Sequence, residues 1–244
     1  MQNAPFSDVH FSPFIVGYAN KDTLSSGNAM LAAQFATVSA IDGSSTLADL
    51  TIGGYNPYDP VEDEGGTSGD FKIMFLSSSG TTEASYSWFD DDEKKGWFDA
   101  SGEAADNVKL EAARGVWTRG LGLSLTSAGQ VSESDVVVTT RSSGNQAVAN
   151  TTPVAIKLSQ IAVTGYEPYD PVEDEGGTSG DFKIMFLTSS GTTAASYSWF
   201  DDDEKTGWFD ANNEDAGNVQ IPAGTGVWTR GMGMTVRIPA PELN

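Results

Sequence analysis

Two acidic, glycine-rich segments carry residues that suit the binding of a hard cation. They cover residues 58–70 and 169–181, and both read YDPVEDEGGTSGD. Ca²⁺ takes about six to eight oxygen ligands from carboxylates, carbonyls and water, and a glycine-rich turn lets carbonyls point inward. The candidate metal ligands are Asp59, Glu62, Asp63, Glu64 and Asp70 in the first segment and Asp170, Glu173, Asp174, Glu175 and Asp181 in the second.

Two interpretations of these segments stay open. Their spacing lacks the alternating acidic start of the EF-hand loop, so a solvated turn or an acidic surface for a protein partner is the favoured interpretation. A Ca²⁺ site is the alternative, and no cofactor is required. A further acidic stretch, residues 90–93 together with Asp99, has the same two interpretations.

Catalysis has little support in the residue types. The only histidine, His10, lies near the N-terminus, so a serine–histidine–aspartate arrangement is available at most once and not in the repeated part. The carboxylates that glycoside hydrolysis needs fall in turns rich in other acids rather than singly in apolar segments. We therefore predict that the protein is not an enzyme.

Tryptophans offer a second kind of binding site, because flat sugar faces stack on exposed indoles. Core burial is the favoured interpretation, since domains of this size bury their largest aromatic side chains. In the alternative interpretation the exposed pair is Trp97 and its equivalent Trp208, because each follows an acidic turn and a glycine. Two such sites in one chain would serve a tandem glycan-binding module through avidity.

The elements that position these residues occur twice. Residues 54–100 return as residues 165–211, a shift of 111 positions, and about four positions in five are identical over residues 54–122. Such a period indicates that each copy forms its own packed unit or half of a shared one. The chain is therefore a tandem duplication.

Each copy has the pattern of short strands. Residues 70–76 alternate apolar and polar side chains, residues 84–89 read as the returning strand, and residues 116–125 read as one further strand. A short helical turn is expected near residues 46–50, with Ser45 or Thr46 as its N-cap. No helix of ten or more residues is evident. The sequence predicts an all-β protein with two tandem, near-identical β-sandwich or barrel-like domains.

The repeat also sets the expected domain boundaries. We predict an N-terminal arm at residues 1–13, a first domain at 14–131, a linker at 132–134 and a second domain at 135–244. The arm belongs to neither copy. It is expected to pack on its own domain or to add a strand to the sheet edge of a neighbouring subunit.

Charge and composition restrict the partners. The net charge of −21 disfavours nucleic acid and anionic membrane surfaces, because binding to phosphates depends on Lys and Arg. No apolar run is long enough to span a bilayer, and the first residues lack the basic and apolar regions of a signal peptide. The absence of cysteine excludes disulfides and thiolate chemistry.

One series of motifs resembles repeats of uncharacterised bacterial surface-type proteins. It consists of residues 207–210 (GWFD), 218–219 (NV) and 222–228 (PAGTGVW). The first copy departs from it, with EAAR at residues 111–114 where the second copy has PAGT at 222–225. The resemblance covers about a third of each unit, implies no activity, and favours an extracellular, cell-surface or virion location.

The sequence as a whole predicts a structural protein. Two similar domains in one chain give pseudo-symmetric surfaces from which repeated contacts are built. We expect a homo-oligomer or polymer that forms a surface layer, a filament or a shell, including a virion coat or decoration protein. The alternative is a tandem carbohydrate-binding or cation-dependent adhesin module.

Overall fold

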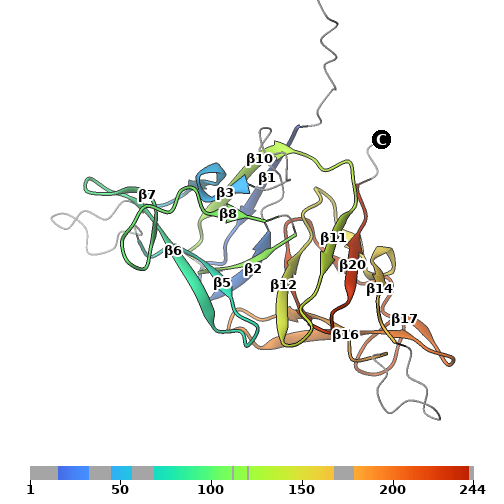
Figure 1. Ribbon diagram of the computed structural model, residues 1–244. Helices are drawn as coiled ribbons and strands as arrows, with labels where there is room; N and C mark the ends of the chain where they lie inside the picture. The colour runs from blue at the N-terminus through green and yellow to red at the C-terminus, as the bar shows by residue number, and fades with distance from the viewer. Residues whose placement is uncertain are drawn as a thin grey trace, which may run out of the picture.

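The computed structural model describes residues 16–32, 45–56, 69–111, 113–119, 121–167 and 179–241. Regular structure in these ranges consists of β-strands and two short 3₁₀ turns, and the small sheets are arranged like a propeller (Figure 1). The predicted all-β fold is confirmed. The predicted N-terminal arm lies outside the described residues. In the described ranges no helix has the length and apolar character needed to cross a membrane.

The first copy forms three antiparallel sheets. Their orders are β1-β10-β4, β2-β9-β5-β6-β7 and β3-β8. The strands are β1 (Val16–Asp22), β2 (Asn28–Ala32), β3 (Ser45–Thr46), β4 (Thr51–Gly53), β5 (Lys72–Leu76), β6 (Thr82–Asp90), β7 (Lys95–Asp99), β8 (Lys109–Leu110), β9 (Gly115–Arg119) and β10 (Ser124–Gln130).

The second copy repeats these sheets in the same order. Its sheets are β11-β20-β14, β12-β19-β15-β16-β17 and β13-β18. The strands are β11 (Val136–Thr139), β12 (Asn145–Ala149), β13 (Ile156–Lys157), β14 (Ala162–Thr164), β15 (Lys183–Leu187), β16 (Thr193–Asp201), β17 (Thr206–Phe209), β18 (Gln220–Ile221), β19 (Gly226–Arg230) and β20 (Thr235–Ile238).

The predicted helical turn is present as a 3₁₀ turn, η1 (Leu47–Asp49), and it recurs as η2 (Leu158–Gln160). Thr46 precedes η1, and its backbone N–H and hydroxyl donate to Asp49 Oδ2 at 2.6 and 2.8 Å. The buried Leu47 and Leu158 anchor these turns in the interior.

The single strand predicted at residues 116–125 is wrong. The chain leaves β9 after Arg119 and enters β10, in a different sheet, at Ser124. Gly122 turns this corner with a φ of 68°, a conformation that suits glycine because it has no Cβ. Gly122 therefore marks a change of sheet, which alternation of side chains alone does not reveal.

Two large apolar clusters lie in the interior, one of first-copy residues and one of second-copy residues with Ala113 of the first copy. In the first copy Phe71, Ile73 and Trp97 are fully buried, and the Phe71 and Trp97 rings lie 5.8 Å apart between centroids. Phe182 and Trp208 repeat that geometry, also at 5.8 Å. Burial alternates along β5, because successive side chains of a strand point to opposite faces. The residues that the two copies share therefore build equivalent interiors.

Candidate functional site at the seam between the copies

The metal site predicted in the acidic segments falls mostly outside the described residues. Only Asp70 and Asp181 are described, and both are exposed. The other candidates lie in ranges that the structure does not describe: Asp59, Glu62, Asp63, Glu64, Asp170, Glu173, Asp174 and Glu175. Among the described residues, no three or more acidic or histidine side chains come together as a metal site would require. The Ca²⁺ hypothesis therefore stays a prediction.

The second acidic stretch holds turns closed. Asp91 Oδ1 accepts the backbone N–H groups of Glu93 and Lys94 at 3.0 and 2.7 Å. Asp99 Oδ1 accepts those of Ser101 and Glu103 at 2.8 and 3.0 Å. The second copy repeats both arrangements with Asp202 and Asp210. Aspartate commonly closes turns in this way, so these carboxylates have a structural role.

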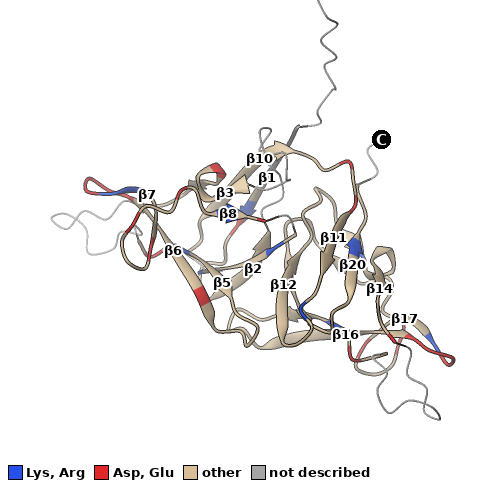
Figure 2. Cartoon of the chain, viewed as in Figure 1, with Lys and Arg blue, Asp and Glu red and all other residues tan. Residues whose placement is uncertain are grey.

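The acidic segments begin and end beside these turns. The N–H of Gly69 donates to the carbonyl of Trp88 at 2.6 Å, and the hydroxyl of Tyr55 donates to Asp90. The same bond at 2.6 Å joins Gly180 to Trp199. Acidic residues gather at the hairpin ends near β7 and near β17, on opposite sides of the molecule (Figure 2). Acidic charge is therefore concentrated at two equivalent, distant ends.

The alternative in which Trp97 and Trp208 are exposed is wrong, and the favoured interpretation, core burial, is what the structure shows. Trp97 is 0% exposed and Trp208 is 1% exposed. Each indole contacts a phenylalanine and a second tryptophan, with the Trp88–Trp97 and Trp199–Trp208 centroids 5.4 Å apart. Buried indoles offer no face to a sugar. The acidic turn before each tryptophan predicts exposure for the turn residues alone. Trp97 and Trp208 lie in the strands after these turns, β7 and β17, and their side chains face the core.

The two copies meet at a third apolar cluster, which we call the seam. Its buried members are Met30 and Trp117 from the first copy and Ala147 and Trp228 from the second. Partly buried side chains from β5 and β15 pack against it: Met74, Leu76, Met185 and Leu187. In Figure 1, β2 and β12 are seen where the two halves of the chain meet. Apolar contact thus joins the two sets of sheets.

Backbone hydrogen bonds cross the seam in matching pairs. Asn28 N–H donates to the carbonyl of Ser189 at 3.0 Å, and its equivalent Asn145 donates to Ser78 at 2.9 Å. The N–H of Ala32 likewise donates to Gly224 at 3.1 Å, which is matched by a bond of 2.8 Å from Ala149 to Ala113. Contacts that pair in this way define a two-fold arrangement, because each surface binds the copy of itself.

A cavity of about 500 Å³ opens at one side of the seam. Its wall combines apolar and polar groups from both copies: Leu76, Glu83, Glu111, Ala113, Arg114, Gly115, Val137, Val138, Thr139, Arg141, Gln146 and Ala147. A volume of this size is typical of sites for small molecules.

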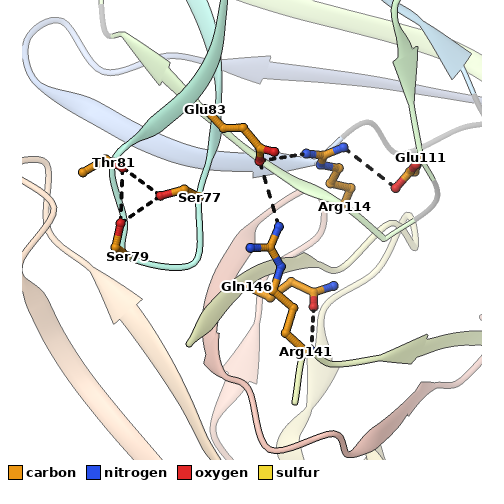
Figure 3. Close-up of polar contacts among 8 residues, drawn as sticks. All are labelled: Ser77, Ser79, Thr81, Glu83, Glu111, Arg114, Arg141 and Gln146. Carbon is orange, nitrogen blue, oxygen red and sulfur yellow. Dashed lines mark hydrogen bonds and ion pairs between the residues drawn. The ribbon is translucent and has the colours of Figure 1, made fainter. Parts of the chain in front are cut away.

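Two guanidinium groups from different copies converge in this cavity on one carboxylate. Arg114 Nη2 and Arg141 Nη2 lie 4.0 and 3.9 Å from Glu83 Oε2, as Figure 3 shows. Arg114 also lies 3.9 Å from Glu111 and sits over the Phe75 ring at 4.2 Å from its centroid. These ion pairs are long and partly exposed, so they hold the charges together weakly.

The equivalent position on the other side of the seam has different residues. Glu83 and Arg114 correspond to Ala194 and Thr225, and the strand register places Leu24 where the second copy has Arg141. Lys21 reaches this side, and its Nζ donates to the carbonyl of Ala223 at 3.1 Å and to Thr225 Oγ1 at 3.3 Å. Of the cavity lining, only Leu76 and Gly115 keep the same residue type in their counterparts, Leu187 and Gly226.

Comparison with known proteins gives no relative. No family model, curated protein or solved structure matches this chain. The interpretation of the site therefore depends on its own geometry.

Sequence reasoning missed the seam cavity. The available signal was the pattern of differences between the copies, since Glu83, Glu111 and Arg114 are among the few positions of the repeat that changed. Arg141 gave no such signal, because its part of the second copy aligns only loosely with the first.

Proposed function

We propose that the protein is a non-enzymatic structural subunit that assembles with further copies of itself into a layer, filament or shell on a cell surface or a virion. In this proposal the two copies act as tandem β-domains at residues 14–131 and 135–244, joined by residues 132–134. The supporting observation is the seam, at which the copies bind each other through matching backbone hydrogen bonds.

The use of the repeated residues also supports this proposal. The tryptophans that recur between the copies are buried or partly buried, and the recurring aspartates of the described turns accept backbone N–H groups. Side chains that recur because they bind a substrate would be expected to face solvent. A duplicated unit that keeps its structural residues is typical of a building block.

An edge strand offers a place for further contacts. Within the described residues β1 pairs only with β10, so its other side is an edge onto which a strand from a neighbouring subunit can add. Residues 1–13 precede this strand in the sequence. In our proposal this arm forms the contact between subunits, and cations screen the repulsion of subunits that each carry a charge of −21.

The alternative of a tandem glycan-binding module loses its candidate residues, because Trp97 and Trp208 are buried. The other alternative, a cation-dependent adhesin module, depends on the acidic segments at residues 58–70 and 169–181.

The test is particle size, measured by light scattering and negative-stain microscopy. The full chain and a variant lacking residues 1–13 are compared, each with Ca²⁺ and with a chelator. Ordered particles that disappear without the arm are the expected result, and loss with the chelator would assign cations to the contacts. A monodisperse monomer in all four samples, 25.7 kDa for the full chain and smaller by the mass of residues 1–13 for the variant, would contradict the proposal.

A further inference from the structure

We propose that the seam cavity between the two copies binds a small organic carboxylate, with Arg114 and Arg141 as the groups that hold its carboxylate. The inference goes beyond the proposed assembly and does not depend on it, because the cavity is formed within a single chain.

The first argument is the state of the two guanidinium groups. Each has five N–H donors, and a guanidinium binds carboxylates best through two parallel hydrogen bonds. In the described part of the chain, Arg114 and Arg141 have only ion pairs of 3.9 to 4.0 Å with Glu83 and Glu111, which exceed hydrogen-bond length. Their donors are therefore available to a ligand.

The second argument is that the Arg114 guanidinium is held in place and that the backbone of Arg141 is ordered. Arg114 stacks on Phe75 at 4.2 Å and its side chain is only 29% exposed. The backbone N–H of Arg141 donates to Gln146 Oε1 at 3.1 Å, which orders the start of the turn that carries it (Figure 3). Positioned donors bind an anion more tightly than mobile surface side chains do, because less side-chain entropy is lost.

The third argument comes from the other side of the seam. There Lys21 donates hydrogen bonds to Ala223 and Thr225, so protein atoms satisfy the cation. On the cavity side the position equivalent to Lys21 in the strand register is Val138, whose side chain is uncharged. The two copies thus differ at the seam: on one side a lysine bonds to protein atoms, and on the other side two arginines line a cavity.

The wall of the cavity indicates the chemical class. The wall is mainly polar, with Gln146 adding an amide group, and Leu76, Val137 and Val138 provide a smaller apolar part. An organic carboxylate with a polar body, of about the size of an acidic sugar, would contact both parts, whereas a bare inorganic anion would leave the apolar part uncovered.

The carboxylate of Glu83 would compete with a ligand carboxylate for Arg114 and Arg141. Its side chain is 52% exposed, and it lies at the head of β6, where it can swing into solvent when a ligand carboxylate takes its place. Removal of Glu83 therefore makes a distinctive prediction. Glu83→Ala, which copies Ala194 of the second repeat, should bind carboxylates more tightly than the unaltered chain.

The experiment is calorimetric titration of the full chain with glucuronate and benzoate at constant ionic strength. Glucose serves as the neutral control ligand and inorganic phosphate as the bare anion. The variants are Glu83→Ala, Arg114→Thr and Arg141→Leu, which take the counterpart residues of the other copy. Arg119→Leu, at an exposed arginine away from the cavity, is the matched control.

We expect a carboxylate to bind the unaltered chain and to bind Glu83→Ala more tightly by about tenfold. Arg114→Thr and Arg141→Leu should each weaken binding by about tenfold or more, the usual effect of losing a charge-assisted hydrogen bond. Arg119→Leu should bind the carboxylate as tightly as the unaltered chain does. Glucose should not bind. Circular dichroism checks that each variant is folded.

Three outcomes would overturn the inference. The first is that no carboxylate binds either the unaltered chain or Glu83→Ala. The second is that Arg119→Leu weakens binding as much as Arg141→Leu, which would mean general attraction to basic groups. The third is that phosphate binds as tightly as the organic carboxylates, which would remove the role of the apolar part of the wall.

Discussion

The backbone N–H of Asn28 donates to the carbonyl of Ser189 in the other copy, at 3.0 Å. Asn145 makes the matching bond to Ser78 at 2.9 Å, so the pair defines the two-fold relation between the copies. The seam around these bonds is apolar and includes Trp117 and Trp228. Its strength is open to direct measurement.

The two halves of the chain should stay together after the connection between them is cut. A protease site inserted at residues 132–134 allows cleavage of the folded protein, and the fragments are expected to co-elute in size-exclusion chromatography. Trp228→Ala removes a large buried side chain from the seam and should promote separation of the fragments. Leu24→Ala, at an exposed leucine outside the apolar cluster, is the control. Immediate separation of the unaltered fragments would contradict the seam as a stable contact.

Gly144 should tolerate alanine less well than Gly122 does. Both have positive φ, 78° and 68°, so alanine costs each about 1 to 2 kcal/mol of backbone strain. A Cβ at position 144 would also lie 2.6 Å from the Cβ of Ser78 across the seam, whereas the nearest atom at position 122 is 3.8 Å away. Urea denaturation should therefore show the larger loss for Gly144→Ala. Equal losses would mean that the seam relaxes at this point.

Trp97→Ala and Trp208→Ala should each lower the free energy of unfolding by about 3 to 5 kcal/mol, as is usual for a large buried aromatic residue. Trp97→Phe should cost less than a typical tryptophan substitution. The reason is that the indole N–H of Trp97 is buried without an acceptor among the described residues, so its loss removes an unsatisfied donor. Denaturation of the three variants tests both statements. A larger loss for phenylalanine than for alanine would contradict them.

Asp135 should make stability depend on acid pH. The N–H of Ala240, which donates to Asp135 Oδ1 at 2.8 Å, holds the pKa of this carboxyl below its ordinary value of 3.8. Partial burial acts in the opposite direction, while the hydrogen bond and charge of Arg237 lower the pKa further. A lowered pKa in the folded state means that the stabilisation is present above the ordinary value and is lost as the pH falls through the lowered one.

Asp135→Asn tests this dependence. We expect the variant to be less stable than the unaltered chain near neutral pH and the difference to shrink as the pH falls below 3.8. Asp92→Asn, on an exposed turn, is the control variant. A difference that stays constant between neutral and strongly acid pH would show that Asp135 acts through shape alone.

The fold could be predicted where the signal is local. The alternation in residues 70–76 and the turn residues that follow are enough to predict β5 and β6. The reason is that a strand shows its period in residues that are neighbours in the sequence. The corner at Gly122 was missed because a strand that changes sheet keeps its alternation on both sides of the break. The hydropathy pattern predicts that a segment is a strand. Which sheet the strand joins depends on pairing with strands that are distant in the sequence.

The candidate site depended almost wholly on distant partners. Glu83 and Arg141 lie in different copies, and no spacing rule relates them. Trp97 was chosen as the candidate for exposure from its neighbours in the sequence, whereas Phe71 and Trp88 pack around it in the core. The differences between the copies were the one sequence signal that pointed to the seam, since a duplicated chain provides its own comparison.

The unequal sides of the seam give the molecule a direction. Its two acidic ends correspond by the two-fold relation and share most of their residues, yet the arginines lie on one side of the seam and Lys21 on the other. A partner that contacts an end alone meets similar residues in both copies. A partner that also touches Arg141 meets a group that the first copy lacks, so this face of the seam distinguishes one copy from the other.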